Sequence, residues 1–457
     1  MNKADLLKAF QAQLNLILAP QISFDQHFHI ALSGGLDSVV LLHLFSRLRD
    51  LDKRYALCAH HINHGLSDNA ADWQLFCQNL CTSLAVEFCC SKVILEKKNR
   101  TSLEALAREK RYACLTGSLT ENSYLITAHH QDDQLETVLL ALKRGSGSTG
   151  LQGIQKRQKL HKGYLIRPLL NFSRDQLAAY AQLFQLDWIE DESNQDQAFD
   201  RNFIRHAITP LLKKRWPGVS KAVARSANIC QEQQLLLDEI ASADFNLLVE
   251  FSLNQPVLPI EDLAALSNGR RNNLLRFWFK KNNLDYPSAK QLQTIWTDVA
   301  LANNDAQPVM QFKGSSVRRY RKHLYLVNDN KLATSINHQI EWQGQDKIVL
   351  LDGLVELSFS VEKDSKAAQN LLNLGDNAKV EICFRCQLPA NLTCQPLGRT
   401  GSRSIKKLLH EYHVAPWLRD LVPFILLDGE LKMAVGLWSC QSEKIAVKPR
   451  YLRVSFV

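Results

Sequence analysis

A short segment rich in serine and glycine carries residue types that could bind an anion. It lies between an apolar stretch at 28–32, which predicts a buried strand, and an apolar-periodic stretch at 39–48, which predicts a helix. Glycines at such a turn let the backbone approach a ligand closely, and the helix start offers unpaired N–H groups and the positive end of its dipole. The segment therefore predicts a phosphate site. Its residues are Ser33, Gly34, Gly35, Leu36, Asp37 and Ser38.

Asp37 limits which phosphate-containing ligand the segment is expected to bind. Its carboxylate would repel phosphate unless a divalent cation lay between them, so we expect a magnesium nucleotide with Asp37 as the metal ligand. The segment is not a Walker loop, because no Gly-Lys-Ser/Thr follows, and it lacks the G-x-G-x-x-G of a dinucleotide fold. A milder interpretation is a turn that only caps a helix.

Three carboxylates open a predicted helix at 132–143, shortly after a predicted strand at 124–128. Residues three and four apart share a helix face, which sets Asp132 beside Glu136 and Asp133 close to it. Acidic residues suit a helix start, and this alone would explain them. In front of a nucleotide site they are also candidates to orient an amine or to hold the metal.

Histidines follow two of the predicted strands and invite comparison with a metal site. Within each group they lie too close along the chain to converge easily on one ion, so we interpret them as polar side chains around a nucleotide base and ribose. The groups are His60, His61 and His64, and His129 and His130.

Strands and helices alternate over the first part of the chain. Further strands are predicted at 55–59, 86–94 and 165–170, and further helices at 1–20, 71–84 and 103–119. This alternation implies right-handed βαβ units and a parallel sheet covered on both faces. Ligands bind beyond the carboxyl ends of such strands, which is where all these polar segments fall. The predicted class is α/β, with a Rossmann-like N-terminal domain.

The character of the sequence changes after residue 218. Helices are predicted at 219–250, 263–280 and 289–300, a strand at 317–325, and a linker at 328–346. The final part shows strands at 348–351, 355–361, 380–384 and 431–435 around one basic helix at 403–413. We expect three domains: 1–216, binding the nucleotide; 217–330, mainly helical; and 347–457, small and α+β.

Basic and aromatic residues lie together in both later domains, as in proteins that grip RNA. The middle domain has Arg270, Arg271 and Arg276 beside Phe277 and Trp278. A solvated helix face is the alternative for any such group. The C-terminal candidates are Arg403, Lys406, Lys407, Trp417 and Arg419.

The composition is that of a globular protein with a mild basic excess. Its 457 residues carry a formal charge of +9 with a pI near 8.9, which is compatible with a polyanionic partner. No apolar run is long enough to span a bilayer, and the first twenty residues resemble an amphipathic helix more than a signal sequence, so we expect a cytoplasmic protein without a membrane partner. The eleven cysteines lack a framework spacing and suggest reduced thiols. Cys383 and Cys386 form one C-x-x-C without a second pair, which leaves a metal or redox role open.

The hexamer SGGLDS resembles the SGGxDS loop of the PP-loop ATP pyrophosphatases, which binds the pyrophosphate part of ATP. Longer runs resemble bacterial tRNA(Ile)-lysidine synthetases, densely over about the first 210 residues and again near the C-terminus. One departure is Ala415, where a proline is expected. The matching runs are 103–108, 125–151, 167–170, 191–205, 404–409 and 416–420.

The resemblance implies an ATP-dependent ligase that acts on the CAU anticodon of an isoleucine tRNA. The wobble cytidine is adenylated with release of pyrophosphate, and the ε-amine of free L-lysine then displaces AMP, giving lysidine and changing codon reading from AUG to AUA. Carried onto this sequence, Ser33 to Ser38 bind ATP, Asp37 holds Mg²⁺, and Arg108 and Arg205 neutralise phosphate. The carboxylates Asp132, Asp133 and Glu136 serve lysine and cytidine.

Two alternatives remain from the sequence. A tRNA thiolase with the same loop would need a sulfur-relay cysteine pair beside the active site, and the C-x-x-C is far away in the sequence. A non-catalytic tRNA-binding protein would not need an intact loop. The sequence is compatible with a homodimer and leaves open both the tRNA features read outside the anticodon and the carboxylate that binds lysine.

Overall fold

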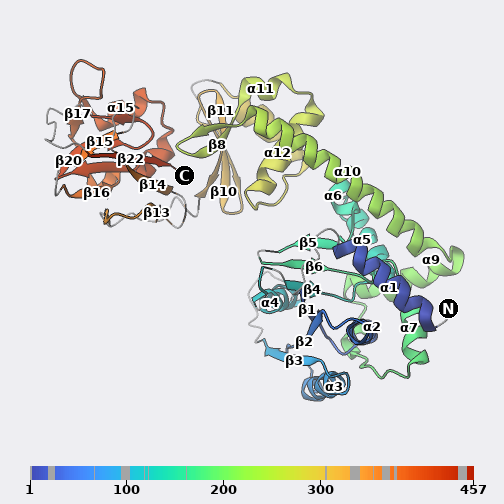
Figure 1. Cartoon of the computed structure of the whole chain (residues 1–457). Coiled ribbons are helices and arrows are strands. Elements are labelled where there is room, and N and C mark those ends of the chain that lie inside the picture. The colour runs from blue at the N-terminus through green and yellow to red at the C-terminus, as the bar shows by residue number, and fades with distance from the viewer. Residues whose placement is uncertain are drawn as a thin grey trace. The chain divides into compact units, whose positions relative to one another are not determined.

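The computed structural model divides into two compact units, Met1–Leu236 and Leu237–Val457, which are described separately. Figure 1 gives the elements in chain order. Within the described part, every helix is too short or too polar to cross a lipid bilayer. The structure describes residues 3–18, 26–65, 67–93, 103–117, 119–121, 123–160, 162–303, 306–329, 340–351, 353, 355–362, 371–374, 378–440 and 450–456.

The first unit is built on a six-stranded sheet of order β3-β2-β1-β4-β6-β5. Five strands run parallel, and only β5 pairs in the antiparallel sense, at the edge. The predicted α/β fold with a parallel N-terminal sheet is therefore confirmed. The strands are β1 Gln26–Ala31, β2 Tyr55–Asn63, β3 Glu87–Lys92, β4 Ser123–Ile126, β5 Arg157–Lys159 and β6 Tyr164–Ile166.

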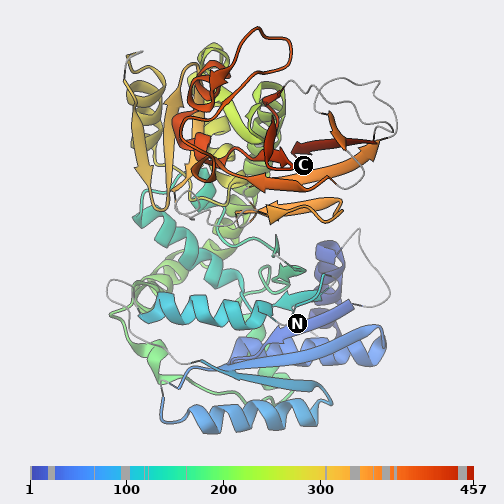
Figure 2. The same cartoon turned by 90° about the vertical axis from the view of Figure 1, so that its left-hand side faces the viewer.

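Helices cover both faces of this sheet because successive strand side chains point to opposite faces (Figure 2). Phe28 and Ile30 of β1 pack into the larger core with α1 Lys3–Leu18, α2 Leu36–Leu51, α3 Ala70–Ser83 and α7 Arg174–Leu183. Ala31 of the same strand faces the other side, where α4 Leu103–Gly117 packs against β4 and β6.

The remaining helices lie in the chain between β4 and β5, as α5 and α6 do, or after β6, where they end in the long helix α10. Their bounds are α5 Gln131–Lys143, α6 Ser148–Leu151, η1 Glu192–Gln195, α8 Asp200–Phe203, η2 Ile204–Ile208, α9 Thr209–Arg215 and α10 Val219–Leu248. The helix predicted at 219–250 is thus confirmed.

The second unit begins with helices packed on an antiparallel sheet of order β7-β8-β11-β10-β9. Leu274, Trp278 and Ile295 bury their side chains against Val317 and Leu324 of this sheet. The helices are α11 Ile260–Ala265, α12 Asn268–Lys281, α13 Ala289–Thr294 and η3 Ile295–Ala300. The strands are β7 Glu250–Ser252, β8 Gln255–Pro259, β9 Val309–Phe312, β10 Ser315–Tyr320 and β11 His323–Asn328.

Two predictions for this region were wrong in detail. The single strand expected at 317–325 is a hairpin, because Arg321 takes a φ of 54° and reverses the chain between β10 and β11. The helix expected at 263–280 is two helices, because Ser267 is extended and its side chain accepts the Arg270 N–H to start a new one.

The last part of the chain is a pair of antiparallel sheets, ordered β12-β16-β19-β20-β21 and β13-β14-β22-β15. Their inner faces share one core, with Leu357 and Val454 from one sheet and Ile382 and Ile425 from the other. The predicted basic helix is α15 Ile405–Glu411, and residues 330–339 of the predicted linker lie outside the described ranges. The remaining elements are β12 Ile340–Glu341, β13 Lys347–Leu350, β14 Val355–Glu362, β15 Leu371–Leu374, β16 Val380–Cys383, η4 Arg385–Gln387, β17 Thr393–Cys394, β18 Arg403–Ser404, η5 Pro416–Leu421, β19 Phe424–Leu427, β20 Glu430–Ala434, β21 Trp438–Ser439 and β22 Arg450–Phe456.

Candidate active site at the carboxyl ends of the parallel strands

The serine- and glycine-rich loop joins the end of β1 to the start of α2. Gly34 has a φ of +88°, a conformation that favours glycine, and a Cβ there would also lie 2.6 Å from Ile189 Cδ1, so that side chain would have to move. The loop is held from within, since Ser38 Oγ lies 3.0 Å from Ser33 Oγ and donates to the Gly35 carbonyl at 2.9 Å. Gly35 is the N-cap of α2 and brings no capping side chain, so the helix start remains suited to an anion.

His130 connects this loop to helix α5. Its buried imidazole places Nε2 at 3.5 Å from Asp37 Oδ2 and at 3.5 Å from Asp133 Oδ2. Its Nδ1 accepts the Asp132 N–H at 3.2 Å, while Asp133 Oδ2 accepts the His130 N–H at 2.9 Å, which completes a capping box. The first helix turn of α5 and the loop carboxylate are therefore positioned by one side chain.

The protonation of His130 follows from the same contacts. Burial alone would lower the pKa of His130, but the charges of Asp133 and Asp37 outweigh it and raise that pKa. A second ring proton would have to sit on Nδ1, where it would displace the Asp132 N–H. We therefore assign the neutral ring with its proton on Nε2, donated toward the carboxylates.

The two oxygens of the Asp37 carboxylate have different surroundings. Asp37 Oδ2 faces His130, whereas Asp37 Oδ1 is buried and has no hydrogen-bond partner among the described residues. A buried carboxylate oxygen without a donor is unfavourable unless a cation completes it. This oxygen, next to a glycine turn that is suited to an anion, fits a Mg²⁺ ion as a ligand.

Asp133 and Glu136 form a buried network with two arginines. Arg205 donates from Nε to Glu136 Oε1 at 2.7 Å and from Nη2 to Asp133 Oδ1 at 3.1 Å. Arg201 donates from Nε to Glu136 Oε2 at 2.8 Å and from Nη2 to Asp133 Oδ1 at 2.9 Å. Burial opposes ionisation of Asp133, but the neighbouring imidazoles of His130 and His129 and the positive charge of Arg201 lower its pKa well below the usual range.

Arg201 was not among the residues that sequence reasoning assigned to the site. It lies at the end of the run 191–205 and four residues before Arg205, so both guanidinium groups share one face of α8 and η2. The sequence does contain a hint of this contact, because two arginines four residues apart on one helix can face two carboxylates three residues apart on another. That these two helices lie side by side is visible only in the fold.

Asp132 points away from this network. Ser220 Oγ donates to its Oδ1 at 2.6 Å, and Lys213 Nζ lies 2.8 Å from its Oδ2. The backbone N–H of Arg174 also donates to Oδ2, at 3.3 Å. Asp132 thereby ties α5 to α7, α9 and α10, which supports a structural role over contact with lysine or cytidine.

The other predicted residues of this unit have varied surroundings. Arg108 lies in α4, but its side chain is not described. His61 Nδ1 is 2.9 Å from the Leu32 carbonyl oxygen, His60 Nε2 is 2.9 Å from Ser91 Oγ, and His129 Nδ1 is 2.9 Å from Thr127 Oγ1. These hydrogen bonds within the protein account for the three imidazoles without a metal ion, and their expected place around a nucleotide base and ribose stays a prediction.

The RNA-binding candidates of the middle domain divide by burial. Arg271 is buried and its guanidinium lies 3.8 Å from the centre of the Trp296 ring, so it belongs to the core rather than to an RNA-facing surface. Arg270 is half-exposed and pairs with Asp244 at 3.1 Å. Arg276 is half-buried on the same helix.

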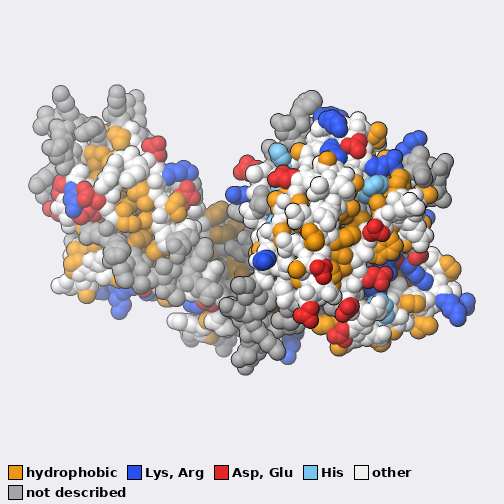
Figure 3. Space-filling view, turned by 90° about the horizontal axis from the view of Figure 1, so that it is seen from below, with side chains coloured by type: hydrophobic (Ala, Val, Ile, Leu, Met, Phe, Trp, Pro, Cys, Tyr) orange, Lys and Arg blue, Asp and Glu red, His pale blue; other side chains and the backbone are white. Residues whose placement is uncertain are grey.

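The C-terminal candidates divide in the same way. Trp417 packs against Tyr320 and Tyr325, with ring centres 6.1 and 5.4 Å away, and is not a free stacking platform. Arg419 Nε donates to the Val414 carbonyl at 3.1 Å. The three exposed cations that remain are Arg403, Lys406 and Lys407. On the face drawn in Figure 3, acidic and basic side chains are interspersed.

The C-x-x-C of the C-terminal part has no further ligands in the structure as described. Cys383 is buried and Cys386 is exposed. Among the described residues, neither belongs to a group of side chains that could hold a metal ion.

Replacing Asp132 by asparagine tests its structural role. We expect Asp132→Asn to lower the free energy of unfolding by about 3 kcal/mol at neutral pH, because it leaves the Lys213 ammonium partly buried without its partner. Burial by itself would raise the pKa of Asp132, but Lys213 and Ser220 lower it. The stabilisation is therefore present above the unfolded-state pKa of about 3.9 and is lost as pH falls through the lower folded-state value.

Urea unfolding of both proteins at neutral and acidic pH measures this difference. Asp175→Asn is the matched control, because that exposed carboxylate also faces Lys213, at 3.8 Å. An Asp132→Asn protein as stable as the control variant would return Asp132 to the candidates for substrate binding.

Three family models match the chain in succession. A PP-loop domain matches residues 6–212, a TilS substrate binding domain matches residues 258–325, and a TilS substrate C-terminal domain matches residues 380–454. Of the solved structures, the U34-tRNA thiolase NcsA from Methanococcus maripaludis covers 50% of the chain with a TM-score of 0.41 and 18% identity, too low to support an inference.

Curated relatives match along almost the whole chain. The tRNA(Ile)-lysidine synthase of Serratia proteamaculans is 41% identical over 93% of this chain and 94% of its own length. The tRNA(Ile)-lysidine synthase of Coxiella burnetii is 39% identical over 92% of this chain and 91% of its own length. With the matching domains in the same order, these similarities place the chain in the tRNA(Ile)-lysidine synthase family.

Proposed function

We propose that the protein ligates L-lysine to the wobble cytidine of an isoleucine tRNA with a CAU anticodon, at the expense of ATP. The observation that carries this is the His130 contact, which joins the phosphate-binding loop to the carboxylates of α5 at one end of the parallel sheet. A nucleotide site and a site for a cationic amine are thereby adjacent. The reaction belongs where ATP, lysine and tRNA meet, in the cytoplasm.

The chemistry proceeds in two balanced steps. The two-position oxygen of the cytosine ring attacks the α-phosphorus of ATP, and pyrophosphate leaves. The ε-amine of lysine then attacks the two-position carbon, and AMP leaves with that oxygen. The tRNA thus gains a lysine side-chain nitrogen on the base, and its anticodon reads AUA instead of AUG.

The loop and Asp37 serve the first step. The loop Ser33 to Ser38 at the start of α2 binds the phosphates through its backbone N–H groups other than those of Ser33, Gly35 and Ser38, which donate within the loop. Asp37, through its free Oδ1, would hold Mg²⁺, which neutralises phosphate charge when bound. Arg205 and Arg108 remain our candidates for neutralising charge on the transferring phosphorus.

The arginine network serves both steps. Asp133 and Glu136 carry two negative charges and Arg201 and Arg205 two positive ones, so the resting site is balanced. Phosphates that attract Arg205 compete for it with both Glu136 and Asp133 and release carboxylate oxygens of these residues toward an incoming ammonium group. Lysine binding is therefore coupled to the arrival of the nucleotide.

Transfer RNA is held mainly outside the catalytic part. We assign the chemistry to residues 1–216 and the tRNA contacts to 217–330 and 347–457. Arg403, Lys406 and Lys407 are the strongest phosphate contacts because they are exposed, and Arg270 and Arg276 add to them in the middle domain.

Incorporation of radiolabelled lysine into tRNA tests the proposed function. With ATP and total tRNA, we expect label in isoleucine tRNA with cytidine at the wobble position and none in the same tRNA carrying uridine there. Asp37→Asn should lower this activity by at least about a hundredfold, because a charge-stabilising group is lost. Asp50→Asn, an exposed change later in α2, is the control. Release of pyrophosphate without labelled tRNA would overturn the ligase assignment.

Measuring the KM for lysine and the KM for ATP separately tests the proposed lysine site. We expect Asp133→Asn to raise the KM for lysine far more than the KM for ATP, because the neutral amide cannot balance an ammonium group. Asp200→Asn is the control, since that exposed carboxylate on α8 pairs with Lys143 away from the network. Equal changes in both KM values would mean that Asp133 only supports the loop.

The salt dependence of tRNA binding tests the basic surface. Replacing Arg403, Lys406 and Lys407 by alanine together should reduce the slope of log K against log salt by roughly two to three, because fewer counterions are released. The matched control removes three lysines of the same part of the chain that pair with glutamates. These are Lys347, Lys379 and Lys432. If both triple variants keep the wild-type slope, the tRNA does not contact α15.

A further inference from the structure

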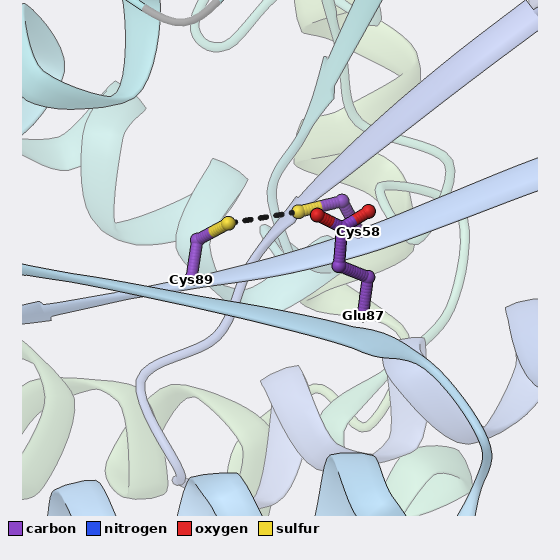
Figure 4. A group of neighbouring side chains, drawn as sticks. All are labelled: Cys58, Glu87 and Cys89. Atoms are coloured by element: carbon purple, nitrogen blue, oxygen red, sulfur yellow. Dashed lines mark hydrogen bonds between the residues drawn. The ribbon is translucent and has the colours of Figure 1, made fainter.

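A cluster of sulfur, carboxylate and imidazole groups lies on one face of β1, β2 and β3, away from the active site. In the strand register, His29 pairs with Cys58, Cys58 with Glu87, and His60 with Cys89. Alternating residues of a strand share a face, so these five side chains lie on the same side of the sheet. Figure 4 shows Cys58 and Cys89 pointing toward each other with Glu87 beside them.

The distances bring three possible ligand atoms together. The Sγ atoms of Cys58 and Cys89 are 3.4 Å apart. Those two sulfurs and a carboxylate oxygen of Glu87 all lie within 4.8 Å of one another. Two thiolates bound to one tetrahedral zinc ion are separated by about 3.8 Å, given Zn–S bonds of about 2.3 Å. The cluster thus needs only a small opening to accept an ion.

The surroundings leave room for a ligand. The cluster borders a cavity of about 260 Å³ that His27, His29 and His60 also line. Helix α4 covers this face of the sheet farther along, where it packs with Leu125 and Leu165 rather than with the cysteines. The cysteines are half-buried and Glu87 is exposed, so an ion can enter from solvent.

The position separates this cluster from the nucleotide site. His29, level with Cys58 in the sheet, precedes Ser33 by four residues, which is about 13 Å along a strand. The cluster therefore takes no part in the ligation chemistry. A disulfide is the other arrangement open to two neighbouring cysteines, but its sulfurs are about 2.05 Å apart, well short of the separation found here.

We propose that Cys58, Cys89 and Glu87 form a binding site for a thiophilic divalent cation of the Zn²⁺ class. Two sulfurs and one carboxylate are ligands that suit such an ion, and water fills the fourth position. Each thiol releases its proton to solvent as its Sγ–metal bond forms. Because Cys58 lies on β2 and Cys89 and Glu87 lie on β3, the bound ion links the edge strand β3 to β2 and stabilises the sheet.

Cobalt titration of the full-length protein tests this site, since Co²⁺ bound to thiolate has a charge-transfer absorption that carboxylate sites lack. Under anaerobic, reducing conditions, we expect a band that saturates at one Co²⁺ per chain and is bleached by Zn²⁺. The band should be lost in Cys58→Ser and in Cys89→Ser. It should persist in Cys90→Ser, the matched control on the same strand, which faces the opposite side of the sheet.

Thermal unfolding with and without Zn²⁺ provides the second measurement. We expect Zn²⁺ to raise the Tm of the wild type and of Cys90→Ser but not of Cys58→Ser, whose fold is checked by circular dichroism. Glu87→Gln should weaken Co²⁺ binding while the thiolate band remains. No thiolate band in the wild type, a band that survives both serine changes, or a disulfide between Cys58 and Cys89 in its place would overturn the proposal.

Discussion

The contact of one buried histidine with two carboxylates organises the catalytic end of this protein. His130 caps helix α5 through Nδ1 and faces Asp37 and Asp133 through Nε2. A buried imidazole can satisfy both demands only as the neutral tautomer with its proton on Nε2. The loop proposed to bind phosphate and the helix that carries the acidic residues are consequently held together by one side chain.

Buried charge sets the second constraint. Glu136 is only 1% exposed and Asp133 is buried beside it, which is tolerable because two guanidinium groups satisfy their oxygens. Arginine is suited to this role, since its planar group donates to two carboxylates at once and keeps its charge. The same pairing keeps two guanidinium groups in fixed positions beside the proposed nucleotide site.

In the second unit, several basic and aromatic residues that are typical of RNA-binding surfaces make contacts inside the protein instead. Arg271 lies against the Trp296 ring, and Trp417 packs among Tyr320 and Tyr325. Arg271 is buried and Trp417 is partly buried, so the surface that either can offer to a base is reduced by packing. The exposed cations Arg403 on β18 and Lys406 and Lys407 on α15 are better suited to contact a phosphate backbone than these aromatic-rich groups.

The α/β class and the polar segments at the ends of the parallel strands follow from the sequence alone, which also marks the serine- and glycine-rich loop as a candidate phosphate site. These depend on local chemistry: apolar runs, the glycines of the turn, and polar residues where strands end. The sequence did not determine the hairpin at Arg321, which depends on one backbone conformation, or the antiparallel sheet around it, whose strands are too short to show a period. Only the tertiary structure separated Asp132 from Asp133 and Glu136, because neighbours on one helix can point into different surroundings. It also brought Arg201 to the carboxylates and Cys58 to Cys89, contacts between segments far apart in the chain whose geometry is set by the packing of the sheet and its helices.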